Sequence, residues 1–480
     1  MEAKRLAGLE PASVFGYFEE ICAIPHGSRN TKALSDYVVR FAQEHGLRYV
    51  QDEMNNVIVY GEGTCAMQNH PTVILQGHLD MVCEKDADCP IDMGTEGLDV
   101  THDDKAVYAR GTTLGGDDGI AVAMGLALLA DPSIPHPPLE VVLTTEEEIG
   151  LLGADALDMS RLQGRTMINL DSEAEGIFTV SCAGGCTATI TLPVERRAVY
   201  GPCIRLSVDG LQGGHSGADI HRNRANANKI MGEFMSRIQK LMPLCLTSFA
   251  GGAKDNAIPR SCRVNLVAMG IHLERINEIA QTLQAEVQAQ YDEPDVRIQA
   301  FDVDALGGNS LTTESTAKVI SLLCSAPNGV QEWSKDMEGL VQTSLNLGVA
   351  KLGERFSATF SVRSSVNAQK QALLAQLSQL AKLLEGGYSQ DGEYPAWEYR
   401  KESPLRDTMV QVYRELFHSE PKVEAIHAGL ECGLFSERLE GLDCVSIGPD
   451  ILDIHTSRER LIIDSTARTW NFLLEVLRNL

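Results

Sequence analysis

The sequence has few basic side chains for its length of 480 residues: 41 Lys and Arg stand against 66 Asp and Glu, and the formal net charge is −25. A surface of this sign repels nucleic acid and anionic membranes, so we expect neither as a partner. Long apolar segments are also missing. The most apolar run, Ile120 to Ala130, is about half as long as a membrane span. The region from Met1 to Glu20 lacks the apolar core of a signal peptide.

The twelve cysteines include no Cys-x-x-Cys pair, and scattered cysteines in a long chain without a leader are typically reduced thiols. These features predict a cytoplasmic protein. No Gly-x-Ser-x-Gly elbow is present, which argues against a serine hydrolase. The glycine-rich segments are not followed by Gly-Lys-Ser or Gly-Lys-Thr, which argues against a phosphate-binding loop.

Four short apolar runs, each followed by polar or acidic residues, organise the two ends of the chain. Such runs, separated by helical patterns, predict the buried strands of a mostly parallel sheet flanked by helices, an α/β fold. Ligands bind outside the carboxyl ends of the strands in such sheets, so we expect the residues that follow the runs to converge on one site. The runs are Val73 to Gly77, Leu139 to Leu143, Met167 to Leu170 and Cys444 to Gly448.

The middle of the chain has a different pattern, in which strands of alternating apolar and polar residues are separated by helices. The expected elements include a helix from Ala218 to Leu241 and a strand from Ala396 to Lys401. Two successive strand–helix–strand–strand–helix–strand passes predict an inserted α+β lid of two ferredoxin-like halves. We therefore expect a catalytic domain made of residues 1–185 and 400–480, with a lid domain at residues 186–399.

The residues after the predicted strands are those that a hydrolase with two metal ions requires. Such a site needs a bridging carboxylate, one His and one further carboxylate for each metal, and a nearby base. Asp80 lies two residues after His78 and is suited to orient the imidazole. In extended backbone Glu147 and Glu148 point in different directions, so that one can bind metal and the other can act as the general base. The candidate ligands are His78, Asp117, Glu148, Asp171 and His455.

These segments resemble the metal-site motifs of the di-zinc peptidase family that contains carboxypeptidase G2, peptidase T and aminoacylase. The motifs are His78-Leu79-Asp80, Gly115 to Gly119, Glu147-Glu148-Ile149-Gly150, Asn169-Leu170-Asp171 and His455. Within that family the chain is more similar to the PepD branch, the aminoacyl-histidine (cytosol non-specific) dipeptidases. Three further segments carry this likeness: Gly213 to Gly217, Asn256 to Arg260 and His427 to Gly433.

The resemblance implies two Zn²⁺ ions per chain, and the same ligands also suit Co²⁺ or Mn²⁺. It implies Glu147 as the general base rather than Glu146, because the family's glutamate pair directly precedes an apolar residue and a glycine. It also implies a cis peptide bond after Asp117. The implied ligand sets are Asp117 as the bridge, His78 and Asp171 on one metal, and Glu148 and His455 on the other.

In the lid, the resemblance implies that His215 polarises the scissile carbonyl, while Asn256 and Arg363 hold the carboxylate end of the substrate. Structural alternatives stay open for each: a polar loop tip, a turn and a surface ion pair, respectively. For His427 and Glu431 two explanations also stay open. Either they line the substrate pocket near the second metal, or they cap and pack a helix.

The combined prediction is a dipeptidase in which a water bridging two zinc ions attacks the amide of a short unblocked dipeptide. Its substrates would include Xaa-His peptides such as β-alanyl-histidine. An N-acyl-amino-acid deacylase or a tripeptidase of the same family is the alternative. A catalytically silent metal-binding scaffold is the alternative of a different class, and Glu147 argues against it. A homodimer through the lid is left open, because a doubled lid can supply His215 within one chain.

Overall fold

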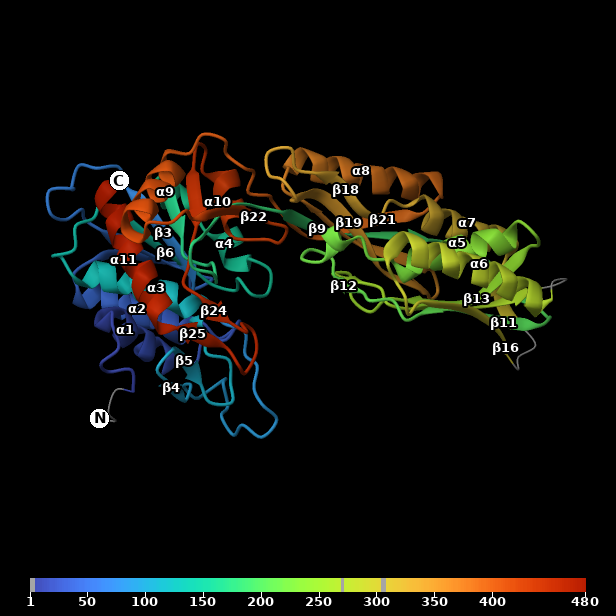
Figure 1. Cartoon of the computed structure of the whole chain (residues 1–480), viewed down its shortest axis with the longest axis horizontal. Helices are drawn as coiled ribbons and strands as arrows, with labels where there is room; N and C mark the ends of the chain where they lie inside the picture. The colour runs from blue at the N-terminus through green and yellow to red at the C-terminus, as the bar shows by residue number, and fades with distance from the viewer. Residues whose placement is uncertain (1–4, 269–271, 304–307) are drawn as a thin grey trace. The chain divides into compact units, whose positions relative to one another are not determined.

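The computed structural model describes residues 5–268, 272–303 and 308–480, and its contacts divide the chain into two compact units (Figure 1). Unit 1 comprises Met1–Cys182, Trp397–Ala425 and Leu430–Leu480, and unit 2 comprises Ala183–Ala396 and Ile426–Gly429. The predicted boundaries place His427 in the catalytic domain, which includes residues 400–480. That assignment is wrong, because the short segment that contains it makes its contacts within unit 2.

An eight-stranded sheet forms the centre of unit 1, in the order β1-β2-β6-β3-β7-β23-β8-β22. The four central strands β6, β3, β7 and β23 are parallel, whereas β1–β2, β2–β6 and β23–β8 are antiparallel. The α/β class is confirmed, and the sheet is mixed, with the parallel pairs at its centre. The strands are β1 (Arg48–Gln51), β2 (Val57–Gly61), β3 (Val73–His78), β6 (Leu139–Thr144), β7 (Thr166–Asn169), β8 (Ile177–Cys182), β22 (Lys422–Ile426) and β23 (Asp443–Ser446).

Every residue of β3 and β6 is buried, as expected for central parallel strands with both faces covered. Helix α3 packs on β3 and α1 packs on α3, while α9 packs on β23 and α11 packs on α9. A second, four-stranded sheet has the order β24-β25-β5-β4. The helices are α1 (Ala12–Cys22), α2 (Lys32–Glu44), α3 (Gly116–Ala130), α4 (Leu152–Ala156), α9 (Pro404–Phe417), α10 (Cys432–Arg438) and α11 (Ile463–Asn479), with a 3₁₀ turn at Met159–Arg161; the small strands are β4 (Val100–His102), β5 (Ala106–Ala109), β24 (Ile451–Leu452) and β25 (Arg460–Ile462).

Unit 2 is built on one antiparallel sheet in the order β16-β11-β15-β13-β19-β20-β9-β21, with β18 paired to β19. Helices α5 to α8 cover one face of this sheet and enclose a large apolar core with it (Figure 1). The strands are β9 (Gly184–Leu192), β11 (Cys203–Asp209), β13 (Leu244–Gly251), β15 (Cys262–Ala268), β16 (Arg297–Val303), β18 (Gly329–Trp333), β19 (Val341–Leu352), β20 (Phe356–Ser364) and β21 (Gly387–Tyr394); the helices are α5 (Ala227–Gln239), α6 (Leu273–Tyr291), α7 (Thr313–Ser325) and α8 (Asn367–Leu383). Two short pairs complete the unit, β10 (Arg196–Val199) with β17 (Gly308–Leu311) and β12 (Gly214–His215) with β14 (Ala257–Ile258), together with a 3₁₀ turn at Ile220–Arg222.

The sheet contains two four-stranded halves of ferredoxin-like order, β16-β11-β15-β13 and β19-β20-β9-β21, which meet where β13 pairs with β19. The halves are nested rather than successive. Strand β9 pairs with β20 and β21 and so belongs to the second half, although it precedes the whole first half in the sequence. The prediction of two successive passes is therefore wrong in its order.

Two predicted elements of this region also differ. No strand is formed from Ala396 to Lys401, where the described backbone has only a single bridge between Cys182 and Trp397. The predicted helix from Ala218 begins only at Ala227, because the side chain of Asn226 accepts the free N–H groups at the helix start.

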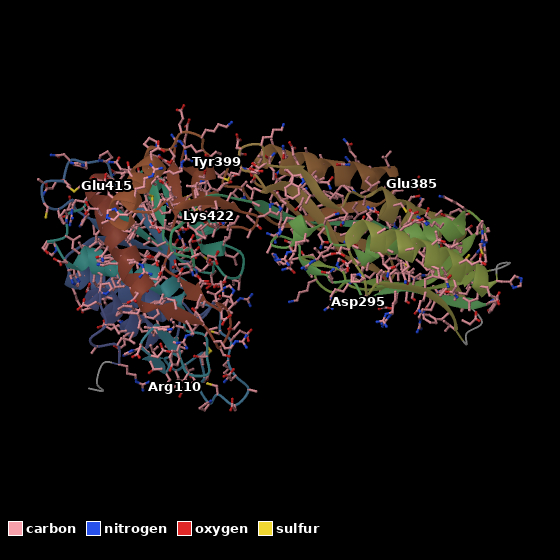
Figure 2. All side chains as sticks on the ribbon, in the orientation of Figure 1. Arg110, Asp295, Glu385, Tyr399, Glu415 and Lys422 are labelled. Carbon is pink, nitrogen blue, oxygen red and sulfur yellow. The ribbon has the colours of Figure 1, made fainter. Side chains whose placement is uncertain are left out.

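Charged side chains cover the outside of both units, as the labelled Arg110 and Glu415 of unit 1 and Asp295 and Glu385 of unit 2 illustrate (Figure 2). None of the helices within the described ranges combines the length and the apolar character that crossing a membrane requires.

Candidate metal centre

Three predicted site segments lie at the carboxyl ends of neighbouring parallel strands. His78 is the last residue of β3, and it pairs in register with Thr144, the last residue of β6. Glu147 and Glu148 follow β6 after two further residues, and Asp171 follows β7 in the same way after one. Parallel pairing therefore brings these segments together at one edge of the sheet, as the sequence predicts.

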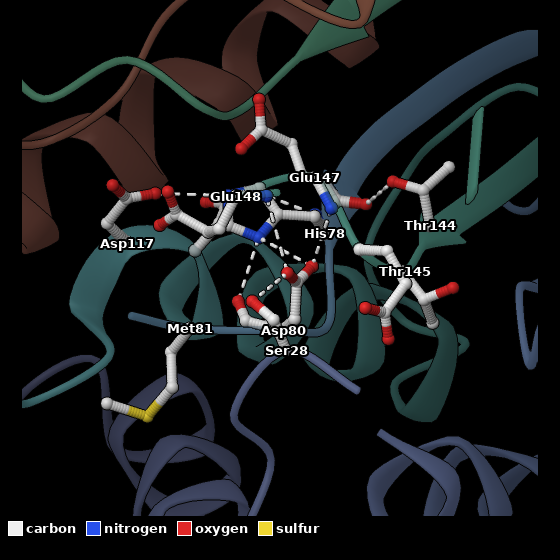
Figure 3. Close-up of polar contacts among 12 residues, drawn as sticks. Ser28, His78, Asp80, Met81, Asp117, Thr144, Thr145, Glu147 and Glu148 are labelled. Atoms are coloured by element: carbon white, nitrogen blue, oxygen red, sulfur yellow. Dashed lines mark hydrogen bonds and ion pairs between the residues drawn. The ribbon is translucent and has the colours of Figure 1, made fainter. Parts of the chain in front are cut away.

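Asp117, in the first turn of α3, lies between the two predicted histidine ligands. Its Oδ1 atom is 3.1 Å from Nε2 of His78, and its Oδ2 atom is 3.2 Å from Nε2 of His455 (Figure 3 shows the first pair). The peptide bond between Asp117 and Asp118 is cis. One carboxylate that presents a separate oxygen to each imidazole is the arrangement expected of a ligand shared by two metal ions.

The remaining predicted ligands complete the two sets. Oδ1 of Asp171 is 3.5 Å from Nε2 of His78, and Oε1 of Glu148 is 2.9 Å from Nε2 of His455. Ligand atoms of Asp117, Glu148 and His455 all lie within 4.8 Å of one another. Oδ2 of Asp171 is buried and has no hydrogen-bond partner among the described residues, so that it is available to a cation.

Asp118 also lies close to His78 and Asp171 and could be taken as a ligand in place of Asp117. Asp117 is the stronger candidate, because Oδ2 of Asp118 already accepts the backbone N–H of His78 at 3.1 Å. Gly77 leaves room for this contact, since a Cβ atom at that position would lie 2.5 Å from the Asp118 oxygen. Asp118 therefore supports the backbone of His78, a candidate ligand, and the sequence motifs alone do not predict this role.

The imidazole of His78 is held in one orientation. Its Nδ1 atom donates a hydrogen bond to the backbone oxygen of Asp80 at 2.9 Å, which leaves the Nε2 lone pair free for a metal (Figure 3). The carboxylate of Asp80 lies farther away, at 3.6 Å from Nδ1. It accepts the backbone N–H groups of Glu147 at 3.0 Å and Glu148 at 3.3 Å. The carboxylate of Asp80 thus holds the glutamate pair, and its backbone carbonyl, rather than its side chain as predicted, holds the imidazole more closely.

Both histidines are surrounded by carboxylates. Hydrogen bonds with Asp117 and Glu148 raise the pKa of His455 to about 10. Burial lowers the pKa of His78, but Asp171 and Asp117 outweigh this effect and raise it well above its ordinary value. Each imidazole is therefore in an environment that favours a positive charge at Nε2.

Two carboxylates of the cluster, those of Asp171 and Glu147, lie where their negative charge is disfavoured. Burial raises the pKa of Asp171 to about 6 and raises the pKa of Glu147 well above its ordinary value. Buried carboxylates so close together cannot all ionise without a counter-charge, and a divalent cation provides one. The donor set of imidazole nitrogens and carboxylate oxygens fits Zn²⁺, Co²⁺ or Mn²⁺.

The third glutamate of the run is directed elsewhere. Glu146 has a positive φ of 57°, and its two carboxylate oxygens accept the backbone N–H of Arg29 at 2.8 Å. Glu147, by contrast, can approach His78 and Glu148 with a carboxylate oxygen. The structure therefore separates a structural Glu146 from the pair at the site.

Glu431, in unit 1, contacts residues of β3 and β6 next to the candidate metal centre, and none of its surface is exposed. Its Oε2 atom accepts hydrogen bonds from Nε2 of Gln76 at 2.5 Å and from Oγ1 of Thr144 at 2.6 Å. It precedes α10, but its side chain makes no capping hydrogen bond there. Burial raises its pKa to about 8. Of the two explanations left open, buried packing fits these contacts, and direct contact with substrate does not.

In unit 2, strand pairing brings two of the predicted substrate residues together. His215 pairs with Ala257, and the backbone oxygen of the adjacent Asn256 accepts the N–H of Ser216 at 2.8 Å. Nδ1 of His215 accepts the N–H groups of Gly217 at 3.2 Å and Ala218 at 3.0 Å, which places the ring proton on Nε2. Burial, followed by the nearby Arg363, lowers the pKa of His215. His215 is therefore a neutral imidazole that can donate from Nε2.

Arg363, on β20, and His427 also belong to this part of unit 2. Nη1 of Arg363 donates to the hydroxyl of Tyr394 at 3.2 Å, and its buried Nε has no hydrogen-bond partner within the described ranges. Nε2 of His427 lies 2.7 Å from Oγ of Ser344. Burial, then the charge of Arg363, lowers the pKa of His427 to about 3. A guanidinium with a donor to spare suits an anionic ligand group.

Comparison with known proteins adds three findings. Residues 74–479 match the model of Peptidase family M20/M25/M40. The cytosol non-specific dipeptidase of Escherichia coli is 36% identical over 480 residues, which cover 99% of both chains. The crystal structure of the aminoacylhistidine dipeptidase from Vibrio alginolyticus superposes with a TM-score of 0.94 at 33% identity, over 100% of this chain and 98% of that one. The aminopeptidase PepT of Bacillus cereus, with a TM-score of 0.56 at 14% identity over 98% of both chains, shares the fold alone.

Proposed function

The chain belongs to peptidase family M20/M25/M40, and from this premise we propose that it is a metal-dependent dipeptidase that hydrolyses the amide of short unblocked dipeptides, including Xaa-His substrates such as β-alanyl-histidine. The observation that carries the proposal is the position of Asp117 between His78 and His455, with one carboxylate oxygen towards each ring. The names of the two relatives that match the chain over its whole length, a cytosol non-specific dipeptidase and an aminoacylhistidine dipeptidase, support the substrate class.

Two Zn²⁺ ions are the proposed cofactors, with Co²⁺ or Mn²⁺ as substitutes. His78 and Asp171 would hold one ion, Glu148 and His455 the other, and Asp117 both, in accordance with the contacts between these side chains. When bound, the metals would supply Lewis-acid polarisation of the amide carbonyl and lower the pKa of a bridging water towards ~7.

Glu147 is the proposed general base. The N–H of its backbone is held by Asp80, and burial raises the pKa of its carboxyl group, which favours uptake of a proton near neutral pH. It would take the proton from the attacking water and pass it to the nitrogen of the leaving amine.

The unit 2 residues are proposed to bind the substrate. The neutral His215 would donate its Nε2 proton to the carbonyl oxygen as negative charge develops there. Arg363 and Asn256 would receive the terminal carboxylate, and the free Nε of Arg363 supports that role. His427, which lies close enough to Arg363 for its charge to lower the pKa of the ring, would line the same pocket.

We also propose that the protein is cytoplasmic, because the name of the Escherichia coli relative places that protein in the cytosol.

Pairing of two chains through unit 2 is a further proposal. Sedimentation of the purified protein at several concentrations would test it, and a monomer at every concentration would contradict it.

Steady-state hydrolysis of a small panel tests the function: β-alanyl-histidine, Gly-His, Leu-Gly, a tripeptide and an N-acetyl amino acid. Each is assayed with metal-stripped protein, with and without added Zn²⁺. Zinc-dependent cleavage of the dipeptides alone is the expected result. Preference for the acylated or longer substrate would replace the dipeptidase by a deacylase or a tripeptidase. No turnover by fully metal-loaded protein would favour the scaffold.

A further inference from the structure

Glu459 is a buried carboxylate that neither the sequence motifs nor the proposed reaction uses. It lies four residues after His455, just before β25, and 3% of its surface is exposed. Its Oε2 atom accepts the backbone N–H groups of Leu114 at 2.8 Å and Gly115 at 3.1 Å. Its Oε1 atom accepts those of Gly116 at 2.8 Å and Asp117 at 3.4 Å. One side chain thus satisfies four consecutive backbone donors that are more than 340 residues away in the sequence.

These four donors form the entry into α3, where the first N–H groups of a helix have no partner within the helix. A carboxylate is favoured at this end of a helix because it accepts hydrogen bonds from the free N–H groups. Its negative charge is also attracted to the positive end of the helix dipole. The entry is irregular here, with Gly115 at φ +68° and Asp117 at non-helical angles. A Cβ atom at Gly116 would lie 3.1 Å from the Glu459 oxygen, so the backbone approaches the carboxylate closely.

The segment from His455 to Glu459 therefore holds Asp117 at two points. The ring of His455 contacts the carboxylate of Asp117 at 3.2 Å, and the carboxylate of Glu459 accepts its backbone N–H. To present one oxygen to each of two metals, the carboxylate of Asp117 must point in a fixed direction. This requires that the backbone of Asp117 is fixed as well. Partners that orient a metal ligand in this way typically change metal affinity by about 10- to 100-fold when they are removed.

We infer that Glu459 is a positioning residue of the metal centre, which fixes the backbone of residues 114–117 so that the carboxylate of Asp117 can bridge two metal ions. The inference rests on the proposed function, since it requires that the centre bind metal. It predicts that Glu459 governs the affinity for the metal ions without touching them.

The variant Glu459→Gln keeps the size of the side chain, but its amide nitrogen cannot accept two of the four N–H groups. Glu140 provides a matched control in the same unit. It is also buried, at 2% exposure, and its carboxylate accepts the backbone N–H groups of Gln163 and Gly164. Neither of these two residues is a candidate metal ligand or a sequence neighbour of one. Glu140→Gln therefore also removes a buried carboxylate that accepts backbone N–H groups, but it does not disturb Asp117.

The measurement is Co²⁺ and Zn²⁺ binding to the metal-stripped full-length protein, by competition with a chromophoric chelator, together with the Co²⁺ absorption spectrum and the melting temperature of the metal-free form. We expect wild-type protein and Glu140→Gln to bind two ions with equal affinity. Glu459→Gln should bind at least one ion about 10- to 100-fold more weakly and show an altered Co²⁺ spectrum. Both variants should melt at lower temperatures than wild type, so melting alone does not separate them.

Equal metal affinity of Glu459→Gln and wild type would overturn the inference, as would an equal loss in both variants. Wild-type protein that binds no metal would instead overturn the proposed function. If Glu459→Gln is not recovered folded, Glu459→Asp takes its place, because it keeps a carboxylate but shortens its reach. An affinity of this variant below that of wild type supports the positioning role, and an unchanged affinity contradicts it.

Discussion

The two units differ sharply in charge and in how their candidate residues are held. Unit 1 contains 45 Asp and Glu against 21 Lys and Arg, whereas unit 2 contains 21 against 20. Almost the whole net charge of −25 therefore belongs to the unit with the candidate metal centre. Within that unit, the side chains of His78, Asp117 and Asp171 are buried. The backbone N–H groups of His78 and Asp117 are bound by the carboxylates of Asp118 and Glu459.

None of the four candidate residues of unit 2 (His215, Asn256, Arg363 and His427) is buried in this way. His215 and Asn256 are exposed, and a donor of Arg363 has no partner among the described residues. The comparison indicates that the carboxylates of a candidate cation site are buried and have part of their backbone anchored. Under the proposed function, the donors of unit 2 would stay free until a small zwitterionic substrate binds. The predictions below test whether unit 1 binds the metal ions and unit 2 binds the substrate, from the largest expected effect to the smallest.

Removal of metal should abolish activity and affect unit 1 alone. All five candidate ligands belong to that unit, so we expect a chelator to stop hydrolysis completely and added Zn²⁺ to restore it. Hydrogen exchange of the β3 and α3 segments should become faster in the metal-free protein, while exchange of β9 and β20 in unit 2 stays the same. Equal changes in both units would contradict the assignment of the ligands.

Loss of the proposed base should remove catalysis but not metal. We expect Glu147→Gln to lower kcat by about 10²- to 10⁴-fold, the usual contribution of general base catalysis, and still to bind two equivalents of Zn²⁺. The neighbouring Glu146→Gln is the matched control, because that carboxylate accepts a backbone N–H of Arg29 outside the cluster. A Glu147→Gln enzyme with near-normal kcat would remove Glu147 from the mechanism.

Arg363→Ala should weaken binding of the free carboxylate end of a dipeptide. A hydrogen bond to a charged group contributes about 1.5–3 kcal/mol, so we expect kcat/KM to fall by about 10- to 100-fold. The same variant should show little change towards a dipeptide with an amidated C-terminus. Arg355→Ala, on the exposed turn between β19 and β20, is the control in the same unit. An equal loss for both substrates would show that Arg363 does not bind the carboxylate.

The buried Glu431 should make stability depend on pH. Its pKa is raised to about 8 in the folded protein, against about 4.3 in an unfolded chain, so the folded state binds the proton more tightly. The resulting stabilisation is complete below about pH 4 and is lost as the pH rises through about 8. In the metal-free protein, the free energy of unfolding of wild type relative to Glu431→Gln should fall by about 4 kcal/mol between about pH 5 and pH 8.5. A difference that does not change with pH would mean that Glu431 titrates normally.

Local sequence was sufficient to predict much of unit 1. The apolar runs that became β3, β6, β7 and β23 bury nearly all of their residues, and this environment needs only apolar side chains in a row. The polar residues at their carboxyl ends were therefore predictable as neighbours. The metal-site motifs around Asp117 and His455 were likewise visible in the sequence, and the cis bond after Asp117 is confirmed.

Only the tertiary structure decided what supports that site and how unit 2 is arranged. The contacts of Glu459 with residues 114–117, those of Glu431 with β3 and β6, and the pairing of β9 with β20 all join segments far apart in the chain. A buried carboxylate and a half-buried strand look the same in sequence whatever their partners are. Hydrophobic periodicity records which side of an element is buried, and it contains no information about which distant backbone donors or strand edges that side meets.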